Sequence, residues 1–136
     1  MAEAVEKRDI WFKSEPAFDV AIRDQFLPAC EAAMAGEFDE LEGYTAGCLA
    51  LTLLLDQCPR NLFRHTARAY AAVARALDVA RYALAKGYDA NVSPWHRAFF
   101  YLPFEHSKNL RDQDLCVELF SRLGIERLYS ILFKIN

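Results

Sequence analysis

The segment LLLDQCPRNLFR (residues 53–64) ends an apolar run with a proline and then presents charged and amide side chains. A second segment, YLPFEHS (residues 101–107), repeats this arrangement later in the chain. A proline removes a backbone donor and clashes with the preceding turn, so each segment predicts the end of a helix. We therefore expect helices that stop near Gln57 and at Pro103. We also expect the two ends to meet in space, with their polar side chains satisfying one another.

The rest of the chain shows helical periodicity and almost no strand signal. Pro28 lies inside the first helical pattern, where it predicts a kink or a break. A stripe formed by Tyr70, Val73, Leu77, Ala80 and Leu84 makes the region from Thr66 to Lys86 the clearest helix. The pattern predicts about six helices, over residues 16–36, 45–57, 66–86, 94–103, 109–123 and 125–135.

Length and composition indicate one helical domain spanning residues 1–136. Short connections predict that successive helices are antiparallel neighbours, in either a solenoid or a compact bundle. The formal net charge of −3 and the sequence pI near 5.6 give no electrostatic footprint for nucleic acid or an anionic membrane.

Targeting and redox signals are also lacking. The N-terminal residues alternate in charge, which is not the pattern of a signal peptide. The longest apolar run, residues 48–55, is far shorter than the roughly 20 residues that span a bilayer. We therefore expect a cytoplasmic protein that does not enter a membrane. No two of the four cysteines have CxxC spacing, so they are expected to be buried packing thiols.

Asp56 and the arginines that follow it are the first candidates for chemistry. A carboxylate near a helix C-terminus is disfavoured unless a cation compensates it, and Arg60 is close in sequence. Asp56 is therefore either one half of a structural ion pair or an acid, base or ligand in a cleft. If Pro59 starts a helix, Arg60, Arg64 and Arg68 form one stripe, which is either an anion site or a solvated face.

The second segment, Glu105-His106-Ser107, has the residue types of a catalytic group. Ser107 or Asn109 is more simply an N-cap of the next helix. A serine nucleophile needs a base and an oxyanion hole, and no G-x-S-x-G elbow is present. The histidines are not paired at helical spacing with other ligands and no HExxH occurs, so we expect neither a metal nor a cofactor.

Taken together, LLLDQCPRNLFRHTARAY (53–70), FFYLPFEHS (99–107) and Gln113 resemble the bacterial domain-of-unknown-function family 924. The resemblance implies an all-helical, right-handed superhelical array like that of tetratricopeptide repeats, and no established activity, substrate or cofactor. The motif positions that it carries over are Asp56, Gln57, Pro59, Arg60, Asn61, Phe63, Arg64, Pro103, Glu105, His106, Ser107 and Gln113.

The chain departs from the family pattern in three places. Lys108 stands where the family tends to have glutamate, and Val73 where aspartate is usual. The family usually continues into a second proline-arginine-asparagine motif, so this chain is expected to lack the usual C-terminal segment and any site completed by it.

Two functions follow from these observations. The first is a non-enzymatic helical binding or scaffold module for an unknown protein partner, favoured by the absence of a complete catalytic set. The alternative is a small enzyme or ligand-binding protein that acts on an anionic metabolite. In either case the candidate polar cluster comprises Asp56, Gln57, Arg60, Asn61, Arg64, Glu105, His106, Ser107 and Gln113.

Residues 125–135 carry Ile125, Leu128, Ile131, Leu132 and Ile135, with aromatic residues between them. A helix that is apolar around most of its circumference cannot bury all of that surface alone at the edge of a domain. We therefore predict that this segment packs against a second copy of the chain to form a homodimer.

Overall fold

The structure, a computed structural model, describes residues 16–123, with side chains described from residue 24. This part of the chain is entirely helical and contains no strand, which confirms the predicted fold class. Its elements in chain order are α1 (Pro16–Met34), η3 (Asp39–Gly43), α2 (Thr45–Leu62), η4 (Ala67–Tyr70), α3 (Val73–Lys86), η5 (Tyr88–Asn91), α4 (Pro94–Glu105) and α5 (Leu110–Leu123).

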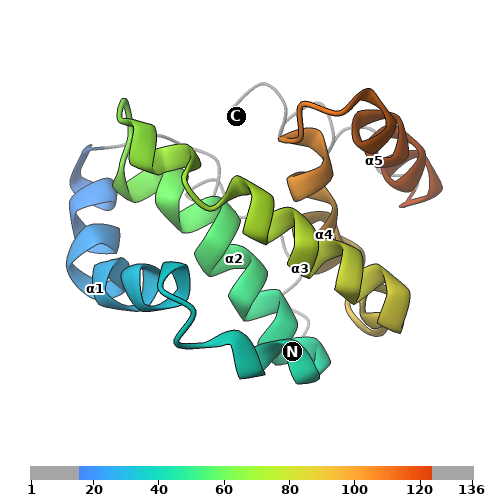
Figure 1. The fold of residues 1–136 in the computed structure, drawn as a ribbon, viewed down its shortest axis with the longest axis horizontal. Coiled ribbons are helices and arrows are strands. Elements are labelled where there is room, and N and C mark those ends of the chain that lie inside the picture. The colour runs from blue at the N-terminus through green and yellow to red at the C-terminus, as the bar shows by residue number, and fades with distance from the viewer. Residues whose placement is uncertain (1–15, 124–136) are drawn as a thin grey trace.

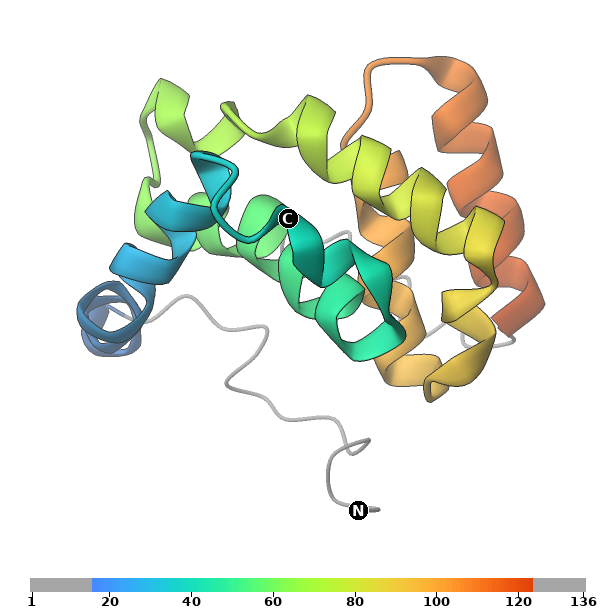
Figure 2. The same cartoon turned by 60° about the horizontal axis from the view of Figure 1, so that its bottom comes forward.

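The helices form an array in which each packs on the next, and α2 lies at its centre. α2 contacts α1, α3 and α4 as well as the three short 3₁₀ helices. The predicted antiparallel arrangement is visible for α2 and α3 (Figure 1) and for α4 and α5 (Figure 2). The predicted sixth helix, over residues 125–135, lies outside the described residues. The resemblance to tetratricopeptide repeats in particular remains a prediction.

Both predicted proline stops are wrong. Pro59 lies inside α2, which continues to Leu62, and Pro103 lies inside α4, which continues to Glu105. Both prolines are almost fully buried, and apolar side chains beyond them, Leu62 and Phe104, are buried as well. A proline inside a helix costs about 3 kcal/mol or more. We attribute the continued helices to this burial, which an early stop would forfeit.

Pro28 is likewise inside α1, which does not break there. Both views show that α1 changes direction along its length (Figures 1 and 2), in agreement with the predicted kink.

The predicted helix 66–86 is divided in the structure. The 3₁₀ helix η4 comes first, and α3 begins only at Val73. Ala69 packs in a small cluster with Cys30 and Leu62, whereas Ala76 belongs to the main core. We attribute the division to these two separate packing contacts, because one straight helix would not place Ala69 in the small cluster and Ala76 in the main core. The predicted end is correct: Gly87 has φ of 74°, a left-handed conformation that glycine adopts without a Cβ penalty.

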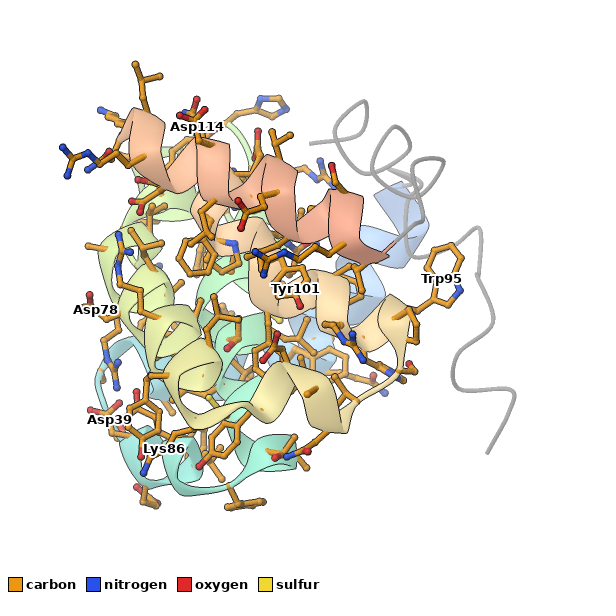
Figure 3. The ribbon with its side chains drawn as sticks, turned by 90° about the vertical axis from the view of Figure 1, so that its right-hand side faces the viewer. Asp39, Asp78, Lys86, Trp95, Tyr101 and Asp114 are labelled. Carbon is orange, nitrogen blue, oxygen red and sulfur yellow. The ribbon has the colours of Figure 1, made fainter. Side chains whose placement is uncertain are left out.

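The face that α3 buries differs from the predicted stripe. The buried residues are the alanines Ala76, Ala80 and Ala83 together with Val79. Small side chains let a helix approach its neighbours closely, so the larger ones are displaced toward the edge of the contact. Leu77 is consequently only partly buried. Asp78 and Lys86 of α3 point outward, as does Asp114 of α5 (Figure 3).

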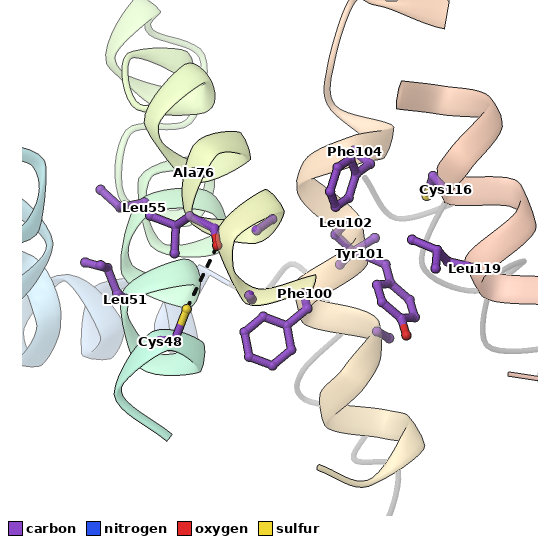
Figure 4. Packing of buried hydrophobic residues seen from close by; sticks show 14 of the residues in the cluster. Cys48, Leu51, Leu55, Ala76, Phe100, Tyr101, Leu102, Phe104, Cys116 and Leu119 are labelled. Carbon is purple, nitrogen blue, oxygen red and sulfur yellow. Dashed lines mark hydrogen bonds between the residues drawn. The ribbon is translucent and has the colours of Figure 1, made fainter. Parts of the chain in front are cut away.

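The main core lies between α2, α3, α4 and α5. Phe100 of α4 points toward α2 and α3, whereas Tyr101 points toward α5 (Figure 4). The Tyr101 ring packs edge-on against Phe120, with their centroids 5.9 Å apart. Between residues 16 and 123, none of the helices combines the length and hydropathy that a bilayer-crossing segment requires.

Candidate functional site

The C-terminal ends of α2 and α4 meet, as the two proline-containing segments predict. His106 Nδ1 lies 2.8 Å from Asp56 Oδ1, and the two side chains are 4% and 1% exposed. Gln57 Nε2 donates to the second carboxylate oxygen of Asp56 at 3.0 Å. Arg60 Nε lies 3.9 Å from the same Oδ1 atom that His106 contacts. The buried carboxylate is therefore held mainly by the imidazole and the amide.

The contact with Asp56 fixes the orientation of the His106 ring. A carboxylate is an acceptor only, so Nδ1 must carry the hydrogen that is shared with Asp56. Nε2 lies 3.2 Å from Glu105 Oε2 but does not make a hydrogen bond with it. Three buried side-chain nitrogens among the described residues have no hydrogen-bond partner, and His106 Nε2 and Arg60 Nε are two of them.

Ser107 belongs to a second group of polar contacts beside the first. Its hydroxyl donates to Asp112 Oδ2 at 2.7 Å, and Arg81 of α3 donates to Asp112 Oδ1 at 2.6 Å. Burial alone would raise the pKa of Asp112, but the hydrogen bonds from Ser107 and Arg81 outweigh it and lower that pKa. Ser107 Oγ also accepts from the Asn109 backbone N–H at 3.1 Å. Asp112, which accepts from both Ser107 and Arg81, therefore ties α3, the α4–α5 connection and α5 together.

The other motif side chains complete the helix ends. Gln113 Nε2 donates to the Ser107 carbonyl at 2.7 Å. Asn61 Nδ2 donates to the Gln57 carbonyl at 3.2 Å, and Arg64 donates to Asn61 Oδ1 at 2.9 Å. These bonds satisfy carbonyl groups and side chains near helix termini, where backbone partners are missing.

The arginine stripe depended on a helix that starts at Pro59, and it does not form, because Pro59 lies inside α2 and α2 ends at Leu62. Arg60 stays near Asp56, with its Cζ atom 5.3 Å from the centroid of the Tyr70 ring. Arg68 instead pairs with Glu31 of α1 at 3.0 Å. The arginines consequently contribute to different parts of the surface.

A cleft of about 890 Å³ opens beside the first group of polar contacts. Its size falls within the usual range of pockets for small ligands. Its polar lining comes from Arg60, Glu105, His106, Ser107, Lys108 and Gln113. Its other wall runs from the end of η4 into the first turns of α3 and is formed by Tyr70, Ala71, Val73, Ala74 and Leu77.

The cleft divides the nine candidate cluster residues into two groups. Five of them line it, namely Arg60, Glu105, His106, Ser107 and Gln113. The remaining four, Asp56, Gln57, Asn61 and Arg64, support those residues or complete the end of α2.

Several parts of the site lie outside the predicted cluster. Asp112 is one of them, and its spacing to Cys116 and Leu119 places it on the buried stripe of α5, where a charge requires a partner. Lys108, a departure from the family pattern, also lines the cleft. The apolar wall has no distinct sequence signal, because Tyr70, Val73 and Leu77 fit the core face of one continuous helix.

Cysteine and metal chemistry find no support in the described part of the chain. Burial raises the pKa of Cys30 and Cys48 to about 11, and that of Cys58 and Cys116 to about 12. Thiols of this kind are protonated at neutral pH and are poor nucleophiles. Within residues 16–123, no three histidine, cysteine, aspartate or glutamate side chains gather in a way that could hold a metal ion.

Comparison with known proteins places these features in a family. The family described as bacterial protein of unknown function (DUF924) matches residues 2–130. The chain belongs to this family.

A solved structure, titled as a protein of unknown function, ATU0120, from Agrobacterium tumefaciens, is also similar. It is 39% identical, with a TM-score of 0.86, and the match covers 96% of this chain and 73% of that one. No curated protein matches the chain.

Proposed function

We propose that this protein binds a small anionic ligand in the cleft between the end of α2, the start of α3 and the α4–α5 connection. The observation that carries the proposal is that five motif side chains line one cleft, and that two of them have buried nitrogens without hydrogen-bond partners. Native proteins rarely leave buried polar groups unsatisfied, so such groups point to a missing partner.

The charges around the cleft support an anion. Arg60 and Lys108 supply two positive charges to its lining, and Glu105 supplies one negative charge. The Asp56 carboxylate is buried and already contacts His106 and Gln57. A guanidinium is suited to recognition of carboxylate or phosphate, and Arg60 is pre-positioned over the Tyr70 ring.

Thermal denaturation in the presence of anions tests the proposal. Phosphate and a series of carboxylates of increasing apolar size should raise the melting temperature, since a ligand at 100 times its Kd adds about 2.7 kcal/mol of stability. Arg60→Met and Lys108→Met should weaken this response while retaining most of the apolar stem. Arg64→Met is the matched control, because Arg64 is absent from the cleft lining. An unchanged response in both cleft variants would contradict the proposal.

A protein-binding scaffold is the second candidate, supported by Tyr70. This residue is 61% exposed and stands beside Arg60 at the cleft, and Tyr and Arg are the residue types most enriched at interface hot spots. A photo-crosslinking residue at position 70 would test it in cells. Reproducible crosslinks to one protein, lost in the Arg60→Met background, would favour the scaffold over a small ligand.

A further inference from the structure

We propose that the ligand is a zwitterion: a free amino acid or short peptide with an apolar side chain. Its ammonium group would bind between His106 Nε2 and Glu105, and its carboxylate would bind Arg60 and Lys108. This inference rests on the proposed function, because it specifies the chemistry of the same cleft.

The His106 ring and the Glu105 carboxylate lie side by side in the lining of the cleft. Because Nδ1 of His106 donates to Asp56, the tautomer with its hydrogen on Nδ1 presents Nε2 as an acceptor. Glu105 Oε2, also an acceptor, lies 3.2 Å away, and the pair does not form a hydrogen bond. Two acceptors at this separation can both accept from one nitrogen, and an ammonium group carries three donors.

Access to this position depends on Glu105. The His106 side chain is 4% exposed and held by Asp56, whereas the Glu105 side chain is 33% exposed. Glu105 is therefore the member of the pair that can rotate. Its rotation would uncover Nε2 of His106 and keep the Glu105 carboxylate in contact with the incoming ammonium group. The ammonium group of a zwitterion would gain an attraction to Glu105 that a purely anionic ligand lacks.

The remaining lining supplies the other parts of such a ligand. Arg60 Nε lies near the same Asp56 oxygen as His106, so the cation and the acceptor pair occupy neighbouring positions. Across the cleft, Val73, Ala74 and Leu77 form an apolar wall that suits an aliphatic side chain. The volume of about 890 Å³ exceeds the need of one amino acid and leaves room for a dipeptide.

Isothermal titration calorimetry with matched probes tests the inference. The probes are L-leucine, L-leucyl-L-leucine, 4-methylpentanoate (no ammonium) and isoamylamine (no carboxylate). At least one of the two zwitterions should bind about tenfold more tightly than either single-charge analogue. In Glu105→Gln this preference over 4-methylpentanoate should disappear, while 4-methylpentanoate binds no more weakly than to the unaltered protein.

The variant has a matched control in Glu118→Gln, because Glu118 is exposed on α5 and pairs with Arg122, away from the cleft. Nitrogen-15 NMR of the unaltered protein gives an independent readout: binding of the preferred zwitterion should shift the Nε2 signal of His106 while Nδ1 keeps its proton.

The possible failures are distinguishable. Equal affinity for 4-methylpentanoate and both zwitterions, or an unmoved Nε2 signal in the bound state, would overturn the zwitterion inference and leave anion binding intact. If none of these probes, phosphate or acetate binds, the proposed function fails as well.

Discussion

Replacing His106 with alanine is expected to destabilise the fold strongly, whereas replacing Arg60 with alanine is not. His106 provides the 2.8 Å contact to an Asp56 carboxylate that is 1% exposed. Removing the imidazole leaves that carboxylate with Gln57 at 3.0 Å and Arg60 at 3.9 Å. Arg60 is 19% exposed, and its loss leaves the closer contacts of Asp56 in place.

The magnitudes follow from burial. Leaving a buried charged group without its closest hydrogen-bond partner costs about 3 kcal/mol, at the upper end of the range for buried polar groups, so His106→Ala should cost about 3 kcal/mol. For a chain of 136 residues this corresponds to a fall in melting temperature of roughly 10 °C. Arg60→Ala loses a long ion-pair contact and a cation–π contact, together worth about 1 kcal/mol or less.

Chemical denaturation followed by circular dichroism measures both effects as unfolding free energies. His65→Asn is the control, because His65 is exposed and has φ of 65°, which asparagine tolerates. A double-mutant cycle with Asp56→Leu should show that the two losses are not additive. Additive losses, or a His106→Ala cost no larger than that of Arg60→Ala, would refute a buried Asp56–His106 pair.

Three further predictions concern the rest of the molecule. Gly47→Ala should destabilise the protein by about 1–3 kcal/mol in denaturant titrations, because the added Cβ would overlap the Leu41 carbonyl oxygen. Gly43→Ala, whose Cβ would meet nothing within 4 Å, is the control and should cost far less. Because the pKa of Asp112 is lower in the folded protein than its unfolded value of 3.8, the carboxylate adds stability above pH 3.8, and this stability is lost as the pH falls through the folded pKa. In Asp112→Asn the free energy of unfolding should therefore fall less steeply toward acid pH. An unchanged dependence on pH would contradict this. Light scattering at micromolar concentration should report a homodimer formed through residues 125–135, and a clean monomer would remove that idea.

The polar cluster could be predicted from sequence because its information is local. The proline segments concentrate charged and amide groups after apolar runs, and buried polar groups must find partners. That reasoning correctly brought the two segments together, but it paired Asp56 with an arginine, whereas in the structure His106, fifty positions away, makes the closest contact with Asp56. It failed on the helix ends, because the backbone rule for proline says nothing about the burial of Pro59 and Pro103.

The cleft itself could not be predicted, since it depends on how α3 packs. A periodic stripe that included Val73 and Leu77 was the natural choice for a core face. In the structure the alanines of α3 take that place, and Val73 and Leu77 line the cleft instead. Hydrophobicity alone does not distinguish these two uses of an apolar side chain, because both remove it partly from water.

Sequence by itself determined the all-helical class, the end of α3 at Lys86, the start of α4 at Pro94 and the types of polar group at the site. These follow from helical periodicity and from the conformational limits of glycine and proline, which act over a few neighbouring residues. Tertiary structure alone decided which prolines remained helical, where α3 began and which side chains faced one cleft. Those outcomes depend on the packing of segments distant in sequence, whose burial outweighs local preference.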